Sequence, residues 1–122
     1  MSLDTEIRPL RREALEELLN GRQALAAAAG LKTRRAAPRW LFSWPVELWI
    51  PDGNGRETYT LATCSNLSTG GVGVICDDAL AVGCEVPVAI HQPEMSFHGR
   101  AVVRHCRKAE EGYHAGLEFV FD

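Results

Sequence analysis

Apolar residues follow two different periods along the chain. Between Pro9 and Leu19 they recur at steps of three and four residues, at Leu10, Ala14, Leu15, Leu18 and Leu19. This spacing places them on one face of a helix. We expect Pro9 in the first turn of this helix, where its missing N–H is tolerated, and Asn20-Gly21 at its end. A second, alanine-rich helical stretch is expected from Arg22 to Ala29.

After Pro38 the pattern changes to short extended runs separated by turn residues, which is typical of an all-β region. Six strands are predicted: Trp44–Ile50, Glu57–Ser65, Gly71–Asp77, Glu85–Gln92, Phe97–Arg107 and Tyr113–Phe121. The loops between them are too short for helical crossovers, so neighbouring strands are expected to pair antiparallel. Six such strands close most easily into a small barrel or pack as two sheets.

The N-terminal helix needs a partner for its apolar face, because a helix this short is marginal alone. Three partners fit: the open end of the barrel, a second copy of the chain in a homodimer, or a second protein. The sequence leaves all three open. We therefore expect an N-terminal helical segment over residues 1–31 and a β-barrel domain, preceded by an arginine-bearing arm, over residues 32–122.

Composition and charge exclude several classes of protein. A hydrophobic content of 46% indicates a folded domain, and a net charge of −3 disfavours a general nucleic-acid binder. No run of residues is apolar enough to span a bilayer, and the start of the chain does not resemble a signal peptide. The four cysteines have no CxxC spacing. We expect a cytoplasmic protein without membrane insertion.

Three arginines precede the first predicted strand. Arg34, Arg35 and Arg39 stand on an arm in which Pro38 disfavours helix at the preceding residue. A guanidinium group binds phosphate, or the O6 and N7 atoms of guanine, through two parallel hydrogen bonds, and its flat face stacks on bases. The arm therefore either binds a flat anionic ligand or is a solvated basic linker.

A polar turn follows the second predicted strand, with the sequence Asn66-Leu67-Ser68-Thr69-Gly70-Gly71. Asn and Ser side chains bond readily to nearby backbone, which suits a turn. Gly70 and Gly71 permit a positive φ and the close approach of a ligand or of another strand. Taken alone, this segment indicates a tight turn.

No catalytic or metal-binding constellation is predicted. The histidines His91, His98, His105 and His114 do not have the local spacing of metal ligands. Ser68 lies in a turn rather than at a strained elbow between a strand and a helix. We expect no enzymatic activity and no cofactor.

Taken together, Arg35-x-x-x-Arg39 before the first strand and Asn66-x-Ser68-x-x-Gly71 after the second resemble the PilZ domain family. The strands around Gly99 to Val103 and Gly116 to Phe119 are also similar to strands of that family. The resemblance covers about residues 34–121. It implies a six-stranded antiparallel barrel that binds cyclic di-GMP.

The resemblance also implies roles for single residues. Arg35 and Arg39 would grip guanine edges and phosphates, and Asn66 and Ser68 would bond a guanine base and the polar edge of the ligand. Gly71 would keep that surface open, and Gly70 beside it is included in the predicted site. Arg34 precedes the motif, as in family members that bind a stacked ligand dimer, so we expect two ligands per site. Arg104 stands where the family often has tryptophan, and we leave it out of the predicted site.

Two functions remain open. The first is a receptor or adaptor whose arm rearranges on binding cyclic di-GMP and so signals to an unidentified protein partner. The second is a PilZ-like module that acts through protein contacts alone and does not bind the nucleotide.

Overall fold

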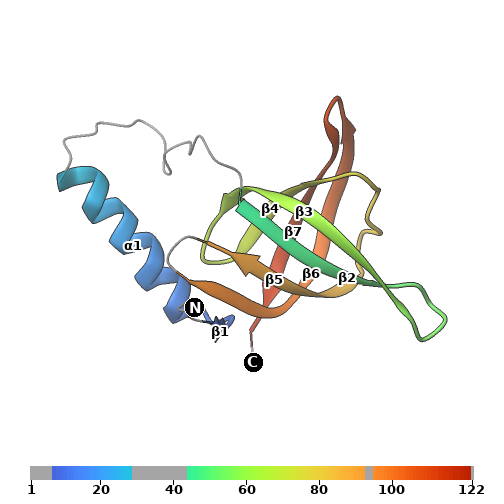
Figure 1. Ribbon diagram of the computed structural model, residues 1–122, viewed down its shortest axis with the longest axis horizontal. Helices are drawn as coiled ribbons and strands as arrows, with labels where there is room; N and C mark the ends of the chain where they lie inside the picture. Colours follow the sequence, from blue (N-terminus) through green and yellow to red (C-terminus); the bar gives the residue numbers. More distant parts are fainter. Residues whose placement is uncertain (1–6, 29–43, 93–94, 122) are drawn as a thin grey trace, which may run out of the picture.

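A computed structural model describes residues 7–28, 44–92 and 95–121. Its elements are a short strand, a helix and six longer strands (Figure 1): β1 (Ile7–Pro9), α1 (Arg12–Ala28), β2 (Trp44–Pro51), β3 (Glu57–Leu67), β4 (Gly71–Cys76), β5 (Glu85–His91), β6 (Ser96–Ala109) and β7 (Gly112–Val120). The six predicted strands are all confirmed, with ends that differ by no more than two residues.

Strands β2 to β7 form a closed antiparallel barrel. The hydrogen-bonded order is β1-β6-β5-β2-β3-β4-β7, and an additional pairing of β6 with β7 closes the sheet on itself. β6 makes this closure possible because, at 14 residues, it pairs with β5 through its first half and with β7 through its second. The predicted six-stranded antiparallel barrel is therefore confirmed.

The barrel interior is filled by every second residue of each strand, as the period of two along a β-strand requires. In β4, for example, Val72, Val74 and Cys76 are buried while the residues between them are not. The largest side chains with almost no exposed surface are Phe97, Leu15, Leu48, Ile90, Val46, Val74, Val86, Val88 and Val103.

The N-terminal segment packs against this core, but it begins differently from the prediction. Pro9 belongs to β1, which pairs in parallel with β6, and the helix begins only at Arg12. An edge strand tolerates proline because one side of its backbone has no neighbour to bond. Leu10 follows, and its N–H donates to the carbonyl of His98 at 2.7 Å. The Leu10 side chain lies against Gly99, where a Cβ atom would be only 2.6 Å from the Cβ of Leu10.

The predicted end of the helix at Asn20-Gly21 is wrong, since α1 continues to Ala28. A glycine inside a helix costs only about 1 kcal/mol relative to alanine. Contacts with the barrel lie on both sides of Gly21: Leu18 is buried in the core, and the Arg22 guanidinium bonds Gln92 Oε1 at 2.5 Å. These contacts keep the chain helical across Asn20-Gly21, where the local sequence favours the end of a helix.

Of the three partners left open for the helix, the barrel is the one found. Leu15 is fully buried and Leu18 nearly so, within a single chain. The predicted homodimer through this helix would therefore have to use other side chains. No helix of the described ranges has the length and apolar character needed to cross a membrane. The predicted boundary between residues 31 and 32 lies outside the described residues.

Candidate functional site

The turn between β3 and β4 is closed by Ser68. Its hydroxyl accepts hydrogen bonds from the N–H groups of Gly70 and Gly71, both at 3.2 Å, and donates one to the Gly71 carbonyl at 3.2 Å. The N–H of Ser68 bonds the same carbonyl at 2.9 Å. These bonds use the donor and both lone pairs of the hydroxyl. In this arrangement Ser68 shapes the turn, and contact with a ligand would require it to exchange one of these bonds.

The two glycines of the turn have different roles. A Cβ atom on Gly71 would lie 2.3 Å from the carbonyl oxygen of Leu117, so glycine is needed for β4 to approach β7. A Cβ atom on Gly70 would meet nothing within 4 Å. The expected close approach of another strand is therefore found at Gly71. Neither Gly70 nor Gly71 adopts a positive φ.

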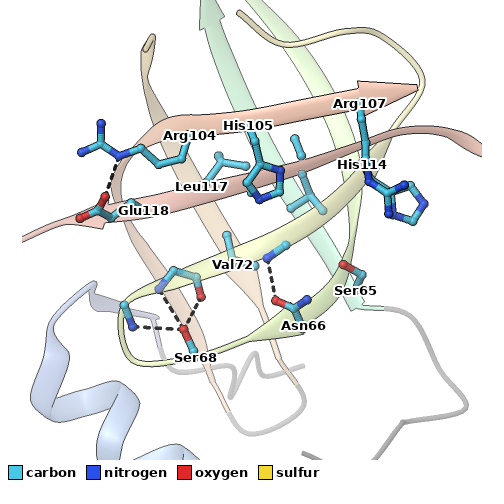
Figure 2. A pocket seen from close by; sticks show the side chains of 16 residues that line it. Ser65, Asn66, Ser68, Val72, Arg104, His105, Arg107, His114, Leu117 and Glu118 are labelled. Carbon is cyan, nitrogen blue, oxygen red and sulfur yellow. Dashed lines mark hydrogen bonds and ion pairs between the residues drawn. The ribbon is translucent and has the colours of Figure 1, made fainter. Parts of the chain in front are cut away.

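Two β-bulges turn extra side chains onto the outer face of the barrel. In β3 the register with β4 shifts between Cys64 and Asn66, and in β6 the register with β7 shifts between Val103 and His105. The extra residues are Ser65 and Arg104. A bulge places two consecutive side chains on one face. Ser65 and Asn66 therefore face outward together on one side, and Arg104 and His105 do so on the other (Figure 2).

Two glycines form the floor between these bulges. Asn66 pairs with Gly73, Gly73 with Gly116, and Gly116 with His105, so the four residues make one row across β3, β4, β7 and β6. A Cβ on Gly73 would lie 2.9 Å from the Asn66 amide, and one on Gly116 would lie 2.1 Å from the His105 ring. The two side chains therefore lean over a flat floor, toward each other (Figure 2).

This floor and its walls form an open groove of about 390 Å³, within the usual range for small-molecule sites. The residues that line it are Ser65, Asn66, Ser68, Gly70, Gly71, Val72, Gly73, Val74, Arg104, His105, Arg107, His114, Ala115, Gly116, Leu117 and Glu118. The Oδ1 atom of Asn66 accepts a bond from the Gly73 N–H at 3.2 Å. One lone pair of that oxygen and the two amide hydrogens remain for a ligand.

The opposite wall is basic. Arg104 Nε bonds Glu118 Oε1 at 2.6 Å, and His114 Nε2 lies 2.5 Å from Glu111 Oε1. The hydrogen bond from His114 lowers the pKa of Glu111. Both pairs are exposed or half-exposed. Exposed pairs contribute little to stability, so a bound anion can compete with Glu118 for Arg104.

The buried thiol of Cys64, two residues before Asn66, is a poor nucleophile. Burial raises the pKa of Cys64 to about 11, and its Sγ lies 3.4 Å from the Asn66 carbonyl, to which it donates. A protonated thiol is a poor nucleophile. Over the described ranges, no group of three or more His, Cys, Asp or Glu side chains is arranged to hold a metal ion.

The structure brings four predicted site residues to this groove: Asn66, Ser68, Gly70 and Gly71. The other three, Arg34, Arg35 and Arg39, lie outside the described residues. Sequence reasoning missed Ser65, His105, Arg107, His114 and Glu118, and it set Arg104 aside although Arg104 lines the groove. One signal was present: His105 and Arg107 are two positions apart in one predicted strand and so share a face.

Comparison with known proteins assigns the fold to a family. The model of the PilZ domain family matches residues 33–122. Six chains of solved structures match, among them the inhibitor of motility of Bacillus subtilis (MotI/DgrA), with 26% identity and a TM-score of 0.51. That match covers 72% of this chain and 43% of MotI, so this chain spans less than half of the longer protein. No curated protein matches significantly. The chain belongs to the PilZ domain family.

Proposed function

We propose that this chain is a receptor for cyclic di-GMP that binds the nucleotide in the groove between the two bulges. The proposal involves binding and signalling, with no catalytic step, no metal and no cofactor. It places the protein in the bacterial cytoplasm, where this second messenger acts.

The observation that carries the proposal is the row Asn66, Gly73, Gly116 and His105 beside the Ser68 turn. The glycines of its floor leave room for the His105 ring and the Asn66 amide, two flat groups that a planar purine can meet. The remaining lone pair of Asn66 Oδ1 suits the N1–H or N2–H donors of guanine. The basic residues of β6 suit the phosphates. Together these features match a ligand with flat guanine bases and negative phosphodiesters.

The connection to the predicted arginine arm supports the same site. Trp44, the first residue of β2, pairs with Cys64, immediately before the bulge that carries Asn66. Arg39 precedes Trp44 by five residues, a length of chain that reaches at most about 17 Å. Arg34, Arg35 and Arg39 are therefore attached where they can reach the groove, and we assign them the contacts with guanine edges and phosphates. Arg34 would serve a second, stacked ligand.

The signal would pass through the segment that joins α1 to β2. Because Leu15 is fully buried, moving α1 as a whole would disrupt the core. We therefore propose that the arginine arm rearranges instead, which would alter the surface offered to a protein partner. Such coupling can be no larger than the difference in ligand affinity between the two arrangements.

A second candidate function is a module that acts only by protein contacts. The similarity to MotI, which is named as an inhibitor of motility, favours it, because inhibiting motility implies contact with other proteins. The two candidates differ in one measurable property, the binding of the nucleotide.

Calorimetric titration with cyclic di-GMP tests the proposal, with cyclic di-AMP as a ligand of equal charge but different base. We expect micromolar or tighter binding of cyclic di-GMP only, at two ligands per chain. Arg35→Ala and Asn66→Ala should each weaken it about tenfold or more, whereas Thr69→Ala, in the same turn but outside the groove, should not. No binding by a folded protein would leave the interaction module as the function.

A further inference from the structure

Two basic side chains of β6, His105 and Arg107, line the groove without a bonded partner among the described residues. Their neighbours differ in this respect, since Arg104 is bonded to Glu118 and His114 to Glu111. Both side chains are exposed, and both belong to the wall that faces Asn66 and Ser68. These two side chains are therefore available to a ligand without the loss of a hydrogen bond or ion pair to another described residue.

The position of His105 is set by the backbone. The bulge at Arg104 shifts the register so that His105 pairs with Gly116, and Arg107, two residues later, pairs with His114. The His105 ring occupies the space above Gly116, where a Cβ atom would lie 2.1 Å from its Nε2 atom. Figure 2 shows the ring pointing into the groove, toward the side that carries Asn66.

The charged groups around His105 come from β6, from β7 and from the turn between them. On β6 they are Arg104 and Arg107, and on β7 they are His114 and Glu118. The turn supplies Glu111, which is bonded to His114. The β3 and β4 residues that line the groove are all neutral. Among the described lining residues, the fixed charges are two guanidinium groups and one carboxylate, and that carboxylate is paired with Arg104, which leaves Arg107 as the lining cation without an ion-pair partner.

We propose that His105 and Arg107 form the phosphate-binding wall of this groove, and that protonation of His105 strengthens nucleotide binding as the pH falls. This inference rests on the proposed function and adds a form of regulation to it. A phosphodiester stays negative, and a guanidinium stays positive, throughout the physiological range. Histidine is the side chain that changes charge between about pH 5 and pH 8. Ligand binding at His105 is then linked to uptake of a proton.

Calorimetric titrations with cyclic di-GMP at pH 6.0 and pH 8.0 test this inference. The wild-type chain should bind about threefold to tenfold more tightly at pH 6.0, the gain expected when one imidazolium contacts a phosphate. His105→Gln, which keeps a polar side chain but cannot become charged, should lose this dependence. His98→Gln is the matched control, because His98 is exposed on the same strand and outside the groove.

A second pair of variants distinguishes the effect of a fixed charge on binding from the effect of pH. Arg107→Gln should weaken binding by about tenfold at both pH values, because its charge does not titrate. Lys108→Gln, the exposed neighbour outside the groove, should bind as the wild type does. Thermal melts at each pH establish that every variant is folded.

The outcomes distinguish the two proposals. If the wild type binds and His105→Gln binds cyclic di-GMP as tightly as the wild type at both pH 6.0 and pH 8.0, the phosphate wall is refuted while the proposed function stands. Tighter wild-type binding at pH 6.0 that disappears only in His105→Gln supports both. Absence of wild-type binding at either pH overturns both.

Discussion

Gly71 is the motif residue for which the structure predicts the clearest effect. A Cβ atom there would lie 2.3 Å from the backbone carbonyl oxygen of Leu117, and the next atoms it meets also belong to the backbone of β7. Neither strand can turn a side chain away to relieve this overlap. In Gly71→Ala, β4 and β7 must therefore separate where Gly71 pairs with Glu118.

The magnitude follows from what this separation disrupts. Overpacking inside a sheet costs about 1–3 kcal/mol, and weakening the adjacent bond from the Phe119 N–H to the Gly70 carbonyl, 2.9 Å long, adds about 1 kcal/mol. We expect Gly71→Ala to lower the free energy of unfolding by about 2–4 kcal/mol. For a domain of this size the melting temperature should fall by about 10 °C.

Urea denaturation of Gly71→Ala and Gly70→Ala, in parallel, measures this cost. Gly70 is the matched control because its Cβ would meet nothing within 4 Å and its φ is not positive. Gly70→Ala should stay within about 0.5 kcal/mol of the wild type. Equal stabilities of the two variants would refute the idea that this glycine is required by the contact between β4 and β7.

Three further predictions concern the helix, the polar surface and the thiols. Leu15→Ala should lower the free energy of unfolding by about 2–4 kcal/mol, whereas Ile7→Ala, at an exposed position, should stay within about 0.5 kcal/mol; equal costs in urea denaturation would show that α1 does not pack on the barrel. Hydrogen bonds from His91 and Tyr59 lower the pKa of Glu47 below its usual 4.5. These bonds to the ionised carboxylate therefore stabilise the fold fully above about pH 4.5, and this stabilisation is lost as the pH falls through the lowered pKa. Thermal melts should therefore show that Glu47→Gln is destabilising at pH 7 and that the difference from the wild type shrinks toward pH 3; a constant difference would contradict this. With a pKa of about 11, Cys64 should resist alkylation at pH 8 in the folded protein and react in urea, as mass spectrometry of the labelled peptides can establish; rapid labelling of the folded form would show that the thiol is accessible.

The strands were predictable because their signal is local. Alternation of apolar residues within β4 and β5, and the turn residues between strands, are properties of short stretches of chain. The helix end was not predictable in the same way. Asn20-Gly21 is a good local stop, but Leu18 and the Arg22–Gln92 bond hold α1 to a barrel formed by residues far along the chain. Tertiary contacts outweighed the local preference.

Only the side of the groove that carries Asn66 and Ser68 was predictable from the sequence. Asn66 and Ser68 belong to a contiguous motif, which the sequence displays. The basic wall depends on a bulge in β6, and a bulge is a property of the register between two strands rather than of either strand alone. His105 therefore could not be assigned to the floor row until its pairing with Gly116 was known. Its shared face with Arg107 was visible, but nothing in the sequence said which way that face turned.

The measurement that tests the central claim most directly is mapping of cyclic di-GMP onto the barrel by NMR, from backbone amide shifts of the labelled chain. The account predicts that the largest shifts fall on Asn66, Gly73, Gly116 and His105, the row across the groove, with little change at Ala89 and His98 of β5 and β6, which lie outside it. Shifts concentrated at Ala89 and His98, or no shifts under saturating ligand, would contradict it.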